Sequence, residues 1–169
     1  MQHAFFVHKG RRLNSTAFWV INAVESPTIK PSPSARVWDR LSALSKRQED
    51  IRIKLSASQP LIVITLGQFA FEFIRRAAGM PAERVDHWSK SRLAFEFHKA
   101  TAETKEPMRT PLIVPLLHAT ISRGQFLDAH RAYTCNEEGN YFEMAGTRIA
   151  AVIIRLPHLP DIWMAPPLE

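Results

Sequence analysis

The chain has 169 residues, of which 46% are hydrophobic and 22% charged, a composition typical of a folded domain with one core and not of a disordered or fibrous protein. Its 22 lysine and arginine residues exceed its 16 aspartate and glutamate residues, and the net charge of +6 favours an anionic partner such as nucleic acid. The one cysteine, Cys135, excludes an internal disulfide and a cysteine-rich zinc site, and it fits a reducing compartment.

The first part of the chain predicts a strand, a long helix and a second strand. Residues 17–22 are aromatic and β-branched, and they stop at Asn22 before a Pro/Ser-rich loop, which predicts a buried strand. From Ser34 to Leu55 apolar residues recur at helical spacing, so we expect Ser34 to cap an amphipathic helix. The continuous apolar run over residues 61–66 predicts a central strand covered on both faces.

The middle of the chain predicts a helix and two more strands. Gly67 opens a helix that we expect to end at Gly79. Residues 93–98 alternate apolar and polar side chains, which predicts a half-exposed strand. Residues 112–118 form another buried run that ends on a histidine, and Pro115 limits it to an edge or to a strand with one missing ladder bond.

The alternation of strands and helices predicts an α/β fold, a three-layer α/β/α sandwich with a central, mainly parallel sheet. A further helix is expected over residues 141–154, followed by an extended proline-rich tail over about 157–169. We expect one domain over residues 1–169. No apolar run approaches the ~20 residues of a membrane span, and the N-terminus lacks the pattern of a secretory signal, so a cytoplasmic protein without a membrane partner is expected.

Polar or flexible residues lie at the ends of the three apolar runs, at the sheet edge where parallel α/β folds bind ligands. They are Asn22 at the first end, Thr65 with Gly67 at the second, and His118 with Ala119 and Thr120 at the third, and we expect these three ends to converge. The asparagine amide can pair with one edge of a base, glycine permits close backbone approach, and histidine can donate to an oxygen that becomes negative as a bond breaks. Each residue alone also has a structural explanation, as a turn former or a satisfied polar group. Their combination favours recognition of a flat polar heterocycle.

Three sequence blocks around these residues resemble successive blocks of the uracil-DNA glycosylase superfamily. The blocks are Ala-Phe-Trp-Val-Ile-Asn-Ala-Val at 17–24, Leu-Ile-Val-Ile-Thr-Leu-Gly-Gln-Phe-Ala at 61–70 and Pro-Leu-Leu-His-Ala-Thr at 115–120. Their order and spacing fit the family over roughly residues 17–130. The resemblance implies that Asn22 reads the uracil edge, that Gly67 lies in the turn that begins a helix, and that His118 is the catalytic histidine.

The resemblance implies a DNA-repair hydrolase that flips uracil out of the stack and cleaves its N-glycosidic bond, leaving an abasic site. Thr120 would bond a phosphate through its hydroxyl group. Arg123, Gln125 and Phe126 would lie in the DNA-binding loop, where Arg123 meets a phosphate and an apolar residue enters the vacated gap. The implied partners are uracil-containing DNA and free uracil as product. We expect a monomer that needs no metal or other cofactor.

Two departures from the family pattern leave other functions open. The opening motif, a Gly-rich turn with a water-positioning Asp or Asn and a nearby stacking aromatic, has no counterpart in this chain, and Ala119-Thr120 stands where Pro-Ser is usual. No acid, Glu72 among them, follows an expected strand, so the water-activating role is unassigned. The first alternative is a truncated or diverged relative that binds nucleic acid or a free base without catalysis. An unrelated α/β small-molecule enzyme ranks last, because the sequence has no P-loop, nucleophile elbow or dinucleotide fingerprint.

Overall fold

The structure is a computed structural model that describes residues 12–17, 19–23, 42–102, 111–118, 127–135, 140–155 and 163–164. The chain forms two compact units, a larger one over Asn22–Tyr133 and a smaller one that joins Met1–Ile21 to Thr134–Glu169. The single domain expected over residues 1–169 stays a prediction. No helix in the described ranges combines the length and the apolar character needed to cross a bilayer.

The larger unit contains a short parallel sheet. Strand β2 (Ile62–Leu66) pairs with strand β3 (Leu112–Leu116) along the full length of both, so that Leu66 lies opposite Leu116. Both strands occur where continuous apolar runs predicted them, and their parallel pairing is confirmed. Within the described residues β3 has β2 as its one neighbour, which is the edge position that Pro115 permits.

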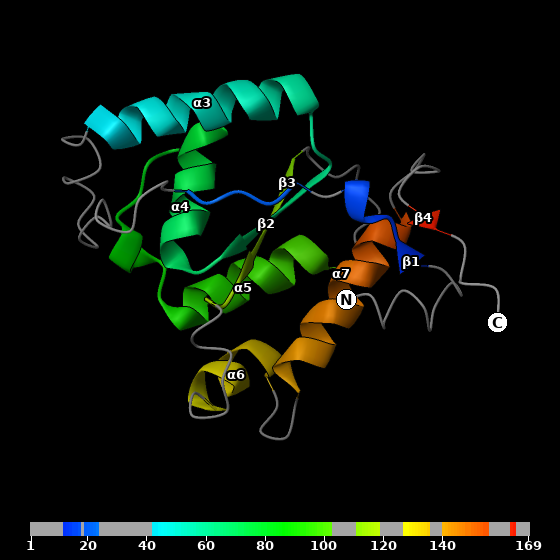
Figure 1. Cartoon of the computed structure of the whole chain (residues 1–169). Helices are drawn as coiled ribbons and strands as arrows, with labels where there is room; N and C mark the ends of the chain where they lie inside the picture. Colours follow the sequence, from blue (N-terminus) through cyan, green and yellow to red (C-terminus); the bar gives the residue numbers. More distant parts are fainter. Residues whose placement is uncertain are drawn as a thin grey trace. The chain divides into compact units, whose positions relative to one another are not determined.

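Helices pack against this sheet, so the larger unit is a mixed α/β structure. Helix α4 (Gln68–Ala77) contacts both strands, and α5 (Lys90–Thr101) packs along β3. Helix α3 (Ser42–Ser58) lies across α4, as Figure 1 shows. It confirms the described part of the helix expected from Ser34 onward, while Ser34 itself lies outside the described residues.

Helix α4 follows the sequence prediction closely. Phe71, Phe73 and Ile74 are buried on its core side. The helix stops at Gly79, whose φ of 76° lets its N–H bond the Arg76 carbonyl at 2.9 Å while the N–H of Met80 bonds the Arg75 carbonyl at 2.9 Å. This pair of bonds satisfies the last carbonyl groups of the helix and needs a residue that tolerates positive φ.

The half-exposed strand expected over residues 93–98 is wrong, because these residues belong to helix α5. The Ser89 side chain caps the helix by accepting from the Arg92 N–H at 3.3 Å. Leu93 and Phe97, four residues apart, are buried on one helical face, while Phe95 between them is 66% exposed. Alternation of apolar and polar residues over so short a segment is compatible with both the strand period and the helix period. The Ser89 cap and the packing against β3 favour the helix.

The buried strand expected over residues 17–22 is also wrong. Ser15–Ala17 form a 3-10 turn, η1, and residues 19–23 have no regular secondary structure. Trp19 is 51% exposed and Val20 is 91% exposed. The Asn14 side chain accepts hydrogen bonds from the Thr16 N–H at 3.0 Å and from its hydroxyl at 2.9 Å, which favours a turn over an extended chain at this point.

The last helix of the larger unit, α6 (Leu127–Thr134), is tied to α5. His98 donates from Nε2 to the Tyr133 carbonyl oxygen at 2.6 Å, and the ring of Tyr133 lies 5.6 Å from that of Phe97. Tyr133 is completely buried. The contact satisfies a carbonyl in the last turn of α6, where no intrahelical donor is available.

In the part of the smaller unit that the structure describes, the chain forms a helix, the 3-10 turn η1 and a two-stranded antiparallel ladder. Helix α7 (Tyr141–Arg155) confirms the helix expected over residues 141–154. Strand β1 (Arg12–Leu13) pairs with β4 (Trp163–Met164), so a described part of the proline-rich tail forms a short strand with the N-terminal region. The rest of the tail lies outside the described residues.

Candidate functional site

The carboxyl ends of β2 and β3 bring Gly67 and His118 into contact. Gly67 follows β2 with a φ of 88°, and its N–H donates to the Leu116 carbonyl oxygen at 2.8 Å. A Cβ atom on Gly67 would lie 3.1 Å from Cβ of His118 and 3.4 Å from its Cδ2. The histidine therefore lies directly against the glycine Cα, an approach that the absence of a side chain permits. Two of the three positions expected to converge, Gly67 and His118, do so.

One face of this strand end is open to solvent. His118 is exposed, and Leu66, which pairs with Leu116 across the sheet, is 49% exposed. Thr65 points to the opposite face, because successive side chains of a strand alternate, and it is buried. Its hydroxyl has no hydrogen-bond partner in the part of the chain that the structure describes. The accessible groups at this edge are thus an imidazole, an aliphatic side chain and a glycine backbone.

The electrostatics of this edge favour negative charge. Helix α4 begins at Gln68, directly after Gly67, and its first turn contains no acidic residue. The first N–H groups of a helix lack intrahelical acceptors, and the aligned peptide dipoles place a partial positive charge at this end. The arrangement can stabilise an oxygen that acquires negative charge next to His118.

Asn22 is held near α3 through its backbone. Its carbonyl oxygen accepts a hydrogen bond from Nη2 of Arg47 at 3.1 Å, and the residue is exposed. Asn22 belongs to the same unit as Gly67 and His118. That its amide faces His118 across one cavity stays a prediction.

The other residues expected at the site fall in the segment between β3 and α6. They are Thr120, Arg123, Gln125 and Phe126, and all four lie outside the described residues. The described residues resume at Leu127, the first residue of α6. The hydrogen bond between His98 and the Tyr133 carbonyl holds α6 against α5.

A buried carboxylate in α4 forms the most extensive polar cluster that the structure describes. Glu72 is completely buried and accepts four hydrogen bonds. Its Oε1 accepts from Nε of Arg76 at 2.8 Å and from the Glu83 N–H at 2.7 Å, while its Oε2 accepts from Nη1 of Arg75 at 2.7 Å and from Nε1 of Trp88 at 2.8 Å. Each oxygen thus has two donors, and no position is left for a substrate proton.

The Glu72 cluster therefore has a structural function. Arg76 also donates to the Glu83 carbonyl oxygen at 2.7 Å, and the Arg75 guanidinium lies 4.5 Å from the ring centroid of Trp88. These contacts fasten the connection between α4 and α5 to the side of α4. The sequence carries one signal for the cluster, arginines three and four residues after a glutamate, but its partners Glu83 and Trp88 could not be identified from that spacing.

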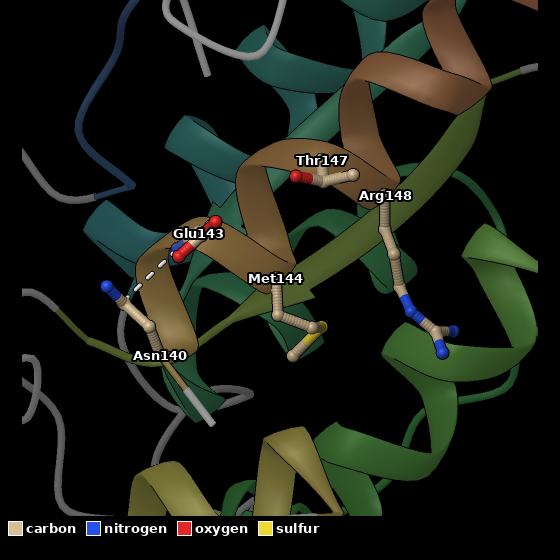
Figure 2. Close-up of a pocket in the computed structure, with 5 residues that line it drawn as sticks. All are labelled: Asn140, Glu143, Met144, Thr147 and Arg148. Atoms are coloured by element: carbon tan, nitrogen blue, oxygen red, sulfur yellow. Dashed lines mark hydrogen bonds between the residues drawn. The ribbon is translucent and has the colours of Figure 1, made fainter. Parts of the chain in front are cut away.

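A separate hollow lies on α7 in the smaller unit. Figure 2 shows its described lining residues, which come from the cap and the N-terminal half of α7: Asn140, Glu143, Met144, Thr147 and Arg148. Its volume is about 340 Å³. Asn140 caps the helix by accepting from the N–H groups of Phe142 at 3.0 Å and Glu143 at 3.3 Å. The hollow contains none of the residues singled out from the sequence.

Among the described residues, no group of three or more His, Cys, Asp and Glu side chains is placed to hold a metal ion. Comparisons of the chain with protein-family models, with curated proteins and with solved structures found no match. A function must therefore be argued from the edge formed by Gly67 and His118 and from the sequence blocks that contain them.

Replacement of Gly67 by alanine is expected to destabilise the protein by about 1–3 kcal/mol, the usual cost of forcing a side chain into a conformation reserved for glycine. The new methyl group would also displace His118, because it would lie 3.1 Å from its Cβ. Urea denaturation measures the first effect, and the NMR shift of the His118 imidazole reports the second.

Gly79→Ala is the matched control for Gly67→Ala. Gly79 also has a positive φ of 76°, but nothing lies within 4 Å of a Cβ atom at that position. The Gly79→Ala variant should be less stable than the wild type, but the position of His118 should not change. A Gly67→Ala protein with wild-type stability and an unshifted His118 resonance would contradict the contact.

Proposed function

We propose that this protein is a uracil-DNA glycosylase-like DNA-repair enzyme, which hydrolyses the bond between uracil and deoxyribose and leaves an abasic site. The main support is the contact between His118 and Gly67 at the carboxyl ends of two parallel strands. Ligands of open α/β sheets bind at this edge. Two of the three sequence blocks that resemble the glycosylase superfamily contain these same two residues.

His118 is proposed to assist departure of the base. When the N-glycosidic bond breaks, its electron pair leaves with uracil, and a carbonyl oxygen of the base becomes negative. A hydrogen bond from a histidine N–H to this oxygen stabilises the transition state more than the ground state. Exposure of His118 and the positive end of α4 beside it support this role. Water supplies a hydroxyl group to the sugar and a proton to the base, and no residue is assigned to orient it.

The base is proposed to be read by Asn22. Its amide carries an acceptor and two donors in one plane, which can pair with an adjacent carbonyl and N–H on the uracil edge. The hydrogen bond from Arg47 to the Asn22 carbonyl supports this role, because it engages the main-chain oxygen and fixes the main chain at this residue.

The remaining parts of the proposal concern the fold and the DNA. The sheet formed by β2 and β3 would be the centre of a three-layer α/β/α sandwich, in accord with the packing of α4 and α5 against it. Thr120 and Arg123 would bind phosphates, Gln125 would contact the DNA from the same loop, and an apolar residue of the loop such as Phe126 would enter the gap left by the flipped base. Uracil-containing DNA would be bound by a monomer without a cofactor, and free uracil would be released.

The proposal is tested by incubating the full chain with an oligonucleotide that contains one uracil and then treating the DNA with alkali. An abasic site breaks in alkali, so a single cleavage at the uracil position is expected. The same oligonucleotide with thymine in place of uracil serves as the control. Binding without cleavage would overturn the catalytic proposal and support the alternative of a relative that binds without hydrolysis, to which the missing opening motif points.

Asn22→Asp is expected to reduce discrimination between uracil and cytosine. The carboxylate replaces two amide donors by acceptors, so the preference for uracil should fall by about 1–3 kcal/mol, the cost of leaving a polar group unpaired. Excision rates on oligonucleotides with uracil or cytosine at one position measure the preference. An unchanged ratio of the two rates would remove Asn22 from base recognition.

A further inference from the structure

We infer that the exposed face of α5 binds single-stranded DNA, with Phe95 stacking on a base and Arg92 and Lys99 contacting flanking phosphate groups. The inference extends the proposed function, since it names the form of DNA that would reach the site, but its test requires no catalysis. It depends on the spacing, exposure and charge of side chains on one helix.

The geometry of α5 places these three side chains on one surface. Arg92 and Phe95 are three residues apart, and Phe95 and Lys99 are four apart, so they are neighbours along one face of a helix. All three are exposed, and Phe95 is the most exposed aromatic residue among those described, at 66%. Leu93 and Phe97 occupy the opposite, buried face. The aromatic ring thus lies in solvent between two cations.

The charge of this surface matches an anionic chain. Lys90 is a further exposed cation at the start of α5, on a different face of the helix from Phe95, and the acidic residue of the helix, Glu96, is half-buried. Arg92 is oriented by hydrogen bonds to the ring and to the carbonyl oxygen of His87. The positive charges of Arg92 and Lys99 therefore lie on the face that carries Phe95.

Arg84 does not add to this surface, since Asp86 accepts two hydrogen bonds from its guanidinium group. The hydrogen bond from Arg84 also holds the pKa of Asp86 below its ordinary value, so Asp86 remains ionised.

An exposed aromatic ring between cations fits a single strand better than a duplex. Bases of a single strand offer their faces for stacking, whereas bases of a duplex are already stacked on one another. The position of the helix agrees with the proposed site, because α5 begins on the side of the sheet where β2 and β3 end (Figure 1). A strand bound along α5 would pass this edge.

The test measures binding of a labelled thymidine oligonucleotide without uracil to the full chain at low salt. Phe95→Ala should weaken binding roughly 5- to 100-fold, as loss of one base–aromatic stacking contact does, and Phe95→Tyr should retain it. Phe142→Ala is the matched control, since Phe142 is 56% exposed in the other unit and should leave affinity unchanged. Lys99→Gln should lower the slope of log affinity against log salt by about 0.7.

Three results would overturn the inference. The first is a Phe95→Ala variant that binds the oligonucleotide with wild-type affinity, and the second is tighter binding of duplex than of single-stranded DNA. The third is self-association of the protein, measured by sedimentation, that is lost in Phe95→Ala, because a second copy of the chain would then explain the exposed ring. Failure here is distinguishable from failure of the glycosylase proposal. Uracil excision together with binding that does not depend on Phe95 would contradict only the proposed DNA-binding surface on α5. Binding that depends on Phe95 without uracil excision would contradict only the proposed glycosylase activity.

Discussion

Replacing Glu72 by alanine is expected to lower the free energy of unfolding by about 3–5 kcal/mol, the cost of removing one partner from a buried ion pair. The substitution leaves the guanidinium groups of Arg75 and Arg76, the Trp88 indole N–H and the Glu83 N–H without their acceptor. These groups lie in or near the core, where water replaces the lost bonds poorly. Urea denaturation followed by circular dichroism measures the change.

Glu49→Ala provides the comparison for Glu72→Ala. Glu49 also forms an ion pair with an arginine three residues later, Arg52, but both side chains are about half exposed, at 52% and 54%. Solvent screens such a pair, so no measurable loss of stability is expected. If Glu72→Ala were as stable as the Glu49 variant, the cluster would not fasten the connection after α4.

His118→Ala is expected to slow uracil excision by ~10²–10³, which corresponds to a loss of about 2.7–4 kcal/mol of transition-state stabilisation. Affinity for uracil-containing DNA should change little, because the hydrogen bond strengthens only as the base acquires charge. Single-turnover excision with enzyme in excess isolates the chemical step, and oligonucleotide binding measures the affinity.

His118→Gln and the folding of His118→Ala serve as controls for this effect. Glutamine retains an N–H donor, so His118→Gln should lose less activity than His118→Ala. His118 is exposed, and its removal should leave the urea midpoint close to that of the wild type. A wild-type excision rate in His118→Ala would remove the histidine from catalysis.

Much of the fold could be predicted where a local pattern has one physical explanation. The apolar runs at β2 and β3 are too short for helices and are covered by α4 and α5, so a strand was the consistent interpretation. Gly67 and Gly79 mark the start and stop of α4 because the chain needs positive φ at both points. The convergence of Gly67 and His118 followed from parallel pairing.

The wrong strand predictions lie where tertiary contacts, and not the local sequence, determine the secondary structure. Residues 93–98 satisfy both the strand and the helix period, and burial of Leu93 and Phe97 against the sheet selects α5. Residues 17–22 have strong strand propensity, yet Trp19 and Val20 are exposed, because propensity supplies no pairing partner. The cluster around Glu72 depends on backbone and side-chain donors from the following loop, and their position is not encoded in any short motif.

The most direct test of a shared base-binding cavity is titration of the protein with free uracil while the NMR resonances of the Asn22 side-chain amide and the His118 imidazole are recorded. Both sets of resonances should shift with one common dissociation constant, and cytosine should shift them less. Resonances that remain unchanged at saturating uracil, or a shift confined to one of the two residues, would contradict the placement of Asn22 and His118 around a single base.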